Sequence, residues 1–303
     1  MKKLFIFFVL LSIAFSAGCS AIGIEDGETP SKNTGYAKSN LNRELSPEVN
    51  SDQIRTLAQD NTAFALSFYD SIRQKEGNII FSPISLSLAL SMTLAGAENA
   101  TEEAMIEALK FSLPEDEIYP TFNALLLAIE DSQQTNMPES EGSEFQLNIA
   151  NSIWGQVGYD FKADFLDVLA INYGAGMHQV DYRTQPEDAR QAINKWIEQE
   201  TQDKIKDLIP QGAINTLTRL VLANAIYFNG SWLHPFDADE TQTAPFYTLD
   251  GSERSVDMMK LYGERLGFTQ GENYQVVDLP YLSNDFSMTI ILPDQGAFTD
   301  VES

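Results

Sequence analysis

The chain offers few side chains from which catalysis could be built. It has two histidines and one cysteine, and neither His178 nor His234 lies at metal-ligand spacing from another His or a Cys. The sequence contains no His-Glu-x-x-His motif, no Gly-x-Ser-x-Gly elbow and no glycine-rich phosphate loop. We therefore predict no catalytic residue, no metal and no cofactor, and we interpret His178 as structural. An enzyme that uses an unrecognised pair among the abundant carboxylates is the alternative.

A second set of polar residues is unusual for its apolar surroundings. Ser82 and Ser85 lie at the start of a helix that is apolar nearly all round, and Asn224 interrupts the otherwise apolar segment 220–228. A buried Asn without partners costs on the order of 1–3 kcal/mol, so Asn224 is expected to have hydrogen-bond partners. These residues form either a satisfied network that fixes the register or a network that is exchanged when a sheet opens.

Composition sets the class of molecule. The 303 residues carry a net charge of −25, with 43% hydrophobic and 21% charged residues, which is typical of a globular protein and excludes a mostly disordered chain. The acidity argues against nucleic acid as a partner, because phosphate binding requires clustered Lys and Arg. The sequence has no apolar run of the roughly 18 residues that a membrane span needs.

The N-terminus has the layout of an export signal. Two lysines precede an apolar run, 4–15, and small residues then lead to Cys19. This pattern predicts a signal peptide at 1–19, with a buried N-terminal helix as the alternative. Cys19 and the residues before it resemble the lipobox of bacterial lipoproteins, although Ser16 stands where that motif usually has Leu. We expect Cys19 to carry acyl chains that anchor the protein stably; a plain signal peptide is the alternative.

Residues 20–50 follow as a polar segment rich in Gly, Pro, Ser and Asn, with Tyr36 as its only aromatic residue. Such a segment cannot bury enough apolar surface to fold, so it predicts a disordered tether. Signal and tether together predict an exported, membrane-anchored lipoprotein on the bacterial cell envelope or outside the cell.

Beyond the tether, apolar spacing predicts helices first and strands later. The segment 220–228 is apolar on both alternating faces apart from Asn224, which predicts a strand buried on both sides. Helices followed by strands indicate an α+β fold. Helical spacing is found at 54–72, 83–95, 122–129, 161–173 and 186–200, and strand patterns at 145–154, 177–182, 220–228, 246–249, 256–259, 265–268, 274–279 and 286–292.

Several of these segments resemble the serpin family. The run from Asn78 through Ser82-Pro83 to Met92 is similar to the serpin helix B region, and 222–232 is similar to strand 3A and the turn after it. The resemblance covers about Ile54 to the end of the sequence, in order. Further matching segments are 197–209 for the end of helix F, 243–246 and 256–259 for the segments after strand 3A, and 286–293 for strand 3B.

This resemblance implies a serpin-like fold, with N-terminal helices packed on large, mostly antiparallel β-sheets, and a protease inhibitor in place of an enzyme. In serpins, a target serine or cysteine protease cleaves an exposed reactive loop, which then inserts into sheet A as a new strand and drags the acyl-enzyme along. By the resemblance, Ser82, Ser85 and Asn224 belong to the shutter under the point where sheet A parts. Trp232 belongs to the breach, where insertion begins, and 186–200 to helix F.

The sequence ends at Ser303, just after the segment that resembles strand 3B. In serpins, strand 5A, the loop hinge and the reactive loop lie further on, so we expect 51–303 to be a partial, C-terminally truncated serpin domain. The apolar edge of 220–228 is then expected to lack a neighbour, and the chain to be unstable or to self-associate. The alternatives are a non-inhibitory binding or scaffold lipoprotein of the same fold and an acidic exported hydrolase.

Overall fold

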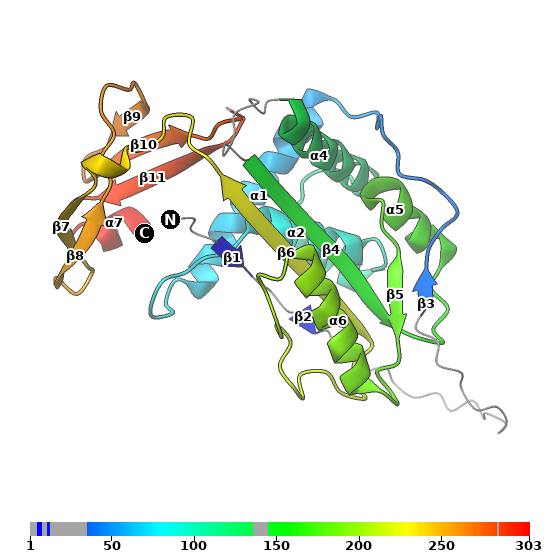
Figure 1. The fold of residues 1–303 in the computed structure, drawn as a ribbon. Helices are drawn as coiled ribbons and strands as arrows, with labels where there is room; N and C mark the ends of the chain where they lie inside the picture. Colours follow the sequence, from blue (N-terminus) through cyan, green and yellow to red (C-terminus); the bar gives the residue numbers. More distant parts are fainter. Residues whose placement is uncertain (1–4, 8–10, 13–34, 136–144, 284) are drawn as a thin grey trace, which may run out of the picture. The chain divides into compact units, whose positions relative to one another are not determined.

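The computed structural model describes residues 5–7, 11–12, 35–135, 145–283 and 285–303 (Figure 1). Its helices are α1 (Ser51–Ile72), α2 (Pro83–Leu94), α3 (Ala100–Leu109), α4 (Glu115–Thr135), α5 (Ala163–Tyr173), α6 (Pro186–Glu200) and α7 (Phe298–Glu302), with a 3-10 turn, η1 (Ala238–Glu240). Its strands are β1 (Phe5–Phe7), β2 (Leu11–Ser12), β3 (Gly35–Ala37), β4 (Phe145–Gln156), β5 (Met177–Val180), β6 (Leu220–Gly230), β7 (Gln242–Tyr247), β8 (Glu253–Met258), β9 (Gly267–Gln270), β10 (Tyr274–Pro280) and β11 (Ser287–Pro293).

The chain divides into two compact units. The larger consists of Lys3–Ala128 and Asn148–Tyr227 and holds most of the helices, and the smaller includes Ile129–Leu147 and Phe228–Ser303 and is mostly strands. Helices early and strands late give the predicted α+β class, which is confirmed.

The central sheet has the strand order β1-β6-β4-β5-β3, and β2 also pairs with β6. Strand β4 runs parallel to β5, with Trp154 opposite His178, and β3 runs antiparallel to β5, with Tyr36 opposite the same histidine. Strands β4 and β6 run in opposite directions (Figure 1). The sheet is therefore mixed, with a single parallel pairing among the registers of its described strands.

Strand β6 is buried on both faces, as its sequence predicts. Val221 and Ala223 pack in one apolar cluster with Ile193 and Ile197 of α6, whereas Leu222 packs with Met92 of α2. Neighbouring side chains of a strand point to opposite faces, so α6 covers one face of the sheet and α2 the other. Asn224 shares the face of Leu222 and is thereby directed at α2.

The edge of β6 that faces away from β4 was expected to lack a neighbouring strand, and the structure differs. Strands β1 and β2 lie along it, with Leu11 opposite Leu222 and Ser12 opposite Val221 in antiparallel register. The prediction that this edge has no neighbour is therefore wrong for the described chain. The physical reason is that the N–H and C=O groups of a buried strand must be paired, and the apolar N-terminal run supplies backbone suited to a strand.

The segment expected to be a tether also differs in its second half. Residues 35–50 contact the folded body: β3 extends the central sheet, and the Glu44 N–H donates to the carbonyl of Ile171 at 2.9 Å. Asn50 then begins α1, where its side chain and that of Gln53 form a reciprocal capping box. Composition missed these contacts because they depend on a sheet edge supplied by distant residues. Residues 20–34 lie outside the described part of the chain.

The smaller unit is built of antiparallel ribbons. Strand β10 pairs with β9 and β11, and β7 pairs with β8 through a turn that contains Gly251, whose φ is +78°. The strands expected at 246–249 and 265–268 are found earlier and later, as β7 and β9. Pairing with β8 and β10 sets where these strands begin and end, and the spacing of apolar residues does not predict that register.

A stack of aromatic rings links β3, β5 and β4 to α6. His178 stacks on Trp154 with 4.1 Å between ring centroids, Tyr36 meets the edge of His178 at 4.8 Å, and Trp196 of α6 lies 6.4 Å from Trp154. Burial lowers the pKa of His178 below its ordinary value of 6.5. The folded chain thus favours the neutral imidazole more than the unfolded chain does.

This pKa gives stability a defined pH dependence. The contribution of neutral His178 is fully present above about pH 6.5 and is lost as the pH falls below that value, because the unfolded chain then binds the proton more readily. We expect the thermal midpoint to drop between about pH 8 and pH 5, and His178→Phe, which keeps a ring in the stack, to drop less. The control is His234→Gln, which should keep the full drop attributable to His178. Equal drops for the wild type and His178→Phe would contradict the prediction.

Candidate functional site

A buried polar cluster lies between β6 and α2. The Ser85 hydroxyl donates to Oδ1 of Asn224, and Nδ2 of Asn224 donates to the carbonyl of Ser85 at 3.2 Å and to Oδ1 of Asn151 on β4. Ser85 is 0% and Asn224 3% exposed. The buried amide therefore has partners on both sides, as the sequence predicts, and three elements are tied together by one side chain.

The start of α2 positions the serines of this cluster. Ser82 is the N-cap, with its side chain accepting from the Ser85 N–H at 3.4 Å, and Pro83 occupies the first turn, where its missing N–H costs nothing. The cap fixes where the helix begins and so turns Ser85 toward β6. Ser82 is half-buried and touches Asn224 in no described hydrogen bond; it acts on the cluster through Ser85.

Sequence reasoning missed one member of the cluster and a row of related serines. Asn151 lies in a segment that alternates like any half-buried strand, so nothing local distinguishes it from its neighbours. Ser87 and Ser91 on α2 are also fully buried; Ser87 donates to Asn61 at 2.9 Å, and Ser91 lies 2.8 Å from the Tyr173 hydroxyl. The recurrence of Ser at 85, 87 and 91 in an apolar helix was the available signal.

The cluster holds its elements by hydrogen bonds, and it has no means of proton transfer. Hydroxyl and amide groups do not titrate in the physiological range, and an activated nucleophile needs an adjacent base. Across the described ranges, no group of three or more His, Cys, Asp and Glu side chains could hold a metal ion. What the cluster offers is directional bonding that is satisfied in the observed arrangement of α2, β4 and β6.

In the smaller unit, Trp232 lies in an aromatic cluster. Its ring stacks on Tyr281 at 4.6 Å with 9° between the planes, and Tyr281 meets Phe228 edge-on at 4.9 Å. Phe145 lies 5.6 Å from Phe228 and stacks on Phe286 at 4.8 Å. Burial raises the pKa of Tyr281, so its hydroxyl stays protonated. The cluster gathers rings from β4, β6 and the turn before β11 around one tyrosine.

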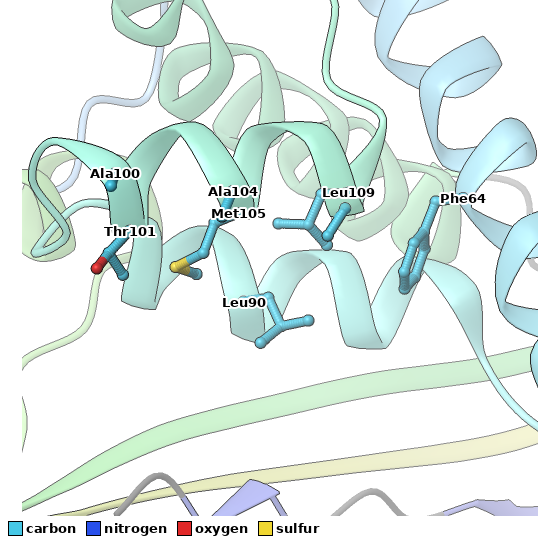
Figure 2. A pocket seen from close by; sticks show the side chains of 8 residues that line it. Phe64, Leu90, Ala100, Thr101, Ala104, Met105 and Leu109 are labelled. Carbon is cyan, nitrogen blue, oxygen red and sulfur yellow. The ribbon is translucent and has the colours of Figure 1, made fainter. Parts of the chain in front are cut away.

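A hollow on the described chain is apolar and offers no reactive group. It has a volume of about 470 Å³ and lies among α1, α2 and α3. Figure 2 shows Phe64, Leu90, Met105 and Leu109 around it, with the Thr101 hydroxyl as the only polar group among the labelled side chains. A binding site usually combines such a lining with several converging polar groups, which this hollow lacks.

The position of Cys19, expected to carry lipid, lies outside the described residues. Among the helices described, none is both long and apolar enough to cross a membrane.

The fold and the cluster together define a class of protein: one with a central strand, buried on both faces, whose single buried amide is hydrogen-bonded to the helix beneath it. A family model described as "Serpin (serine protease inhibitor)" matches residues 59–303. The chain belongs to the serpin family.

Three similar proteins show the range of the family. An uncharacterized serpin-like protein of Methanosarcina mazei is 35% identical over 99% of this chain and 67% of its own length, and the leukocyte elastase inhibitor of Sus scrofa is 36% identical over 78% of this chain and 61% of its own. The crystal structure of reactive loop cleaved human thyroxine binding globulin matches with a TM-score of 0.70 and 28% identity, over 82% of this chain and 72% of that one. The chain thus spans about two thirds of the length of these relatives.

Replacing Asn224 tests whether its bonds act as a unit. We expect Asn224→Ala to lower the free energy of unfolding by about 2–3 kcal/mol, because Ser85 and Asn151 lose a buried partner. The measurement is urea-induced unfolding followed by circular dichroism. The matched control is Asn40→Ala at an exposed position, which should change little.

A second variant separates coupling from simple loss of packing. Asn151→Ala and Asn224→Ala remove the same hydrogen bond, so the double variant should cost less than the sum of the two single variants. Strictly additive costs would contradict the cluster.

Proposed function

We propose that the full-length protein is a serpin-type inhibitor of a serine or cysteine protease. The target cleaves a reactive loop, the loop inserts into the central sheet beside β6, and the acyl-enzyme is carried along and distorted. The chain then acts as a protease's substrate once and has no catalytic turnover of its own.

One observation carries this proposal: the buried strand β6 is held from below by exchangeable polar bonds, and its outer edge takes up added strand. The side-chain hydrogen bonds of Asn224 go to α2 and β4. None of these bonds runs to the other edge of β6, where β1 and β2 pair. Along that edge, β1 and β2 add to the sheet through main-chain pairing, the interaction that loop insertion uses.

The residues divide the work by place. Ser82, Ser85 and Asn224, with Asn151, act as the shutter beneath the opening, and Trp232 acts in the breach, where its stack on Tyr281 must loosen first. Helix α6 acts as helix F: it packs across the sheet through Ile193 and Ile197 and must yield when the sheet expands. Each role is carried by a group that holds the closed state and can be replaced in the open one.

We also propose that the protein is exported from a bacterial cell and held at the envelope by lipid on Cys19. Cleavage before Cys19 would remove β1 and β2, because both lie in the expected signal peptide. The edge of β6 would then be freed only after export, where foreign proteases are met. A net charge of −25 leaves nucleic acid an unfavourable partner.

The second candidate is a non-inhibitory binding or scaffold lipoprotein of the same fold. The observation in its favour is the likeness to thyroxine binding globulin, a relative named for binding, at a TM-score of 0.70. A loop hinge of small residues favours inhibition, and a bulky or charged hinge favours the binding protein.

The inhibitor proposal predicts a covalent complex. The full-length protein, mixed with a trypsin-like or a subtilisin-like protease, should give a band that survives SDS and has the summed mass of both proteins. Protease whose active-site serine is blocked should give none, because no acyl-enzyme forms. In the same assay, Asn224→Ala should yield less complex and more cleaved or polymerised inhibitor. Cleavage without complex for every active protease tried would support the binding protein instead.

The anchor proposal predicts membrane association that depends on one thiol. Expressed in a bacterium with its own leader, the wild type should sediment with membranes and take up radiolabelled palmitate, because two or three acyl chains hold a protein stably. Cys19→Ser should abolish the label and release the protein into the soluble exported fraction. Ser20→Ala is the matched control and should behave as the wild type. Unlabelled wild-type protein would contradict lipidation.

A further inference from the structure

The outer edge of the central sheet is closed by residues from before the first helix. In β3, Gly35, Tyr36 and Ala37 pair antiparallel with Gln179, His178 and Met177 of β5. The Tyr36 hydroxyl accepts from the Gly176 N–H at 2.7 Å, and Ala37 packs against the cluster that contains Met177 and Met92. This edge is the one opposite to the edge of β6 that carries β1 and β2.

The same stretch continues onto the helices. Nε of Arg43 donates to Oδ1 of Asn123 on α4 at 2.8 Å, and Nδ2 of Asn123 donates back to the Glu44 carbonyl at 2.6 Å. The Glu44 N–H in turn donates to the carbonyl of Ile171 on α5 at 2.9 Å. Residues 35–44, the strap, thus bind a strand at one end and two helices at the other.

The body is shaped to receive the strap. A Cβ on Gly176 would lie 2.7 Å from the Ala37 carbonyl oxygen, 2.8 Å from the Tyr36 ring and 2.9 Å from Cβ of Lys38. All three nearest atoms belong to the strap, and the φ of Gly176 is not in the left-handed region, so the backbone itself would accept Ala. The closest contacts of a side chain at 176 would therefore all be with the strap.

We propose that the strap is a restraint on the central sheet: it clamps β5 to α4 and α5 and, through the ring of Tyr36 against His178, steadies the aromatic stack beneath α6. While it is bound, the flank formed by β5 and β4 cannot shift relative to the helices. The link between such shifts and loop insertion rests on the proposed function. The restraint on the sheet before insertion does not depend on it.

The test is hydrogen exchange of the β5 amides, 177–180. The whole chain is labelled with no target protease present, and the exchange is read by mass spectrometry. Gly176→Ala should speed their exchange roughly tenfold or more, because the added methyl group displaces the strap. Releasing the strap from its own side with Tyr36→Ser and Ala37→Pro should do the same, since proline removes an N–H from the strand. The matched control is Leu45→Ala, at a position 71% exposed just past the strap, with exchange as in the wild type.

A combination of variants makes the inference falsifiable even if one of them is unstable. In the chain already released by Tyr36→Ser and Ala37→Pro, adding Gly176→Ala should speed exchange little further, because the three atoms nearest the methyl group belong to the strap that has already left. If Gly176→Ala speeds exchange as much in the released chain as in the wild type, its methyl group acts on residues other than the strap, and the proposal is overturned. Exchange that is unchanged both in Gly176→Ala and in the chain with Tyr36→Ser and Ala37→Pro would also overturn it. A missing protease complex, by contrast, would overturn the proposed function alone.

Discussion

The hydrogen bonds of Asn224 are the constraint on which the rest of the structure depends. Its amide is buried in a strand whose other inward groups are apolar, so every bond must come from protein: from Ser85 on α2 and from Asn151 on β4. Apolar contacts tolerate small slips, but an amide that loses its partner in a dry site does not. One side chain thereby sets the register of β6 against its neighbouring strand and against the helix below.

The edge of β6 imposes a second requirement, on the backbone. An edge strand presents a row of unpaired N–H and C=O groups, which favours the pairing of another strand beside it. Here the partners are the short strands β1 and β2. A site defined by main-chain pairing accepts many sequences, because the bonding groups are the same in every residue except proline.

Much of this arrangement was predictable from the sequence, for identifiable reasons. The all-round apolar α2, the capping Ser82 and the buried strand with one amide are each visible in local spacing, and the need to satisfy Asn224 predicts a partner. Its second partner, Asn151, was not predictable, because only tertiary register brings β4 within reach. The strand β3 was missed for the same reason: Tyr36 lies in a polar segment, and the sheet edge that holds it is formed by residues far along the chain.

The two kinds of cohesion in the sheet have different consequences for movement. Ring stacks such as His178 on Trp154, or Trp232 on Tyr281, are held by contacts that weaken gradually as the rings slide apart. Hydrogen bonds of a buried amide weaken steeply with angle, so the Asn224 cluster is either fully hydrogen-bonded or broken. In a sheet that combines them, the ring contacts can loosen by small steps while the Asn224 hydrogen bonds still hold the register. The directional bonds of Asn224 therefore specify the register, whereas the apolar clusters around β6 supply the burial.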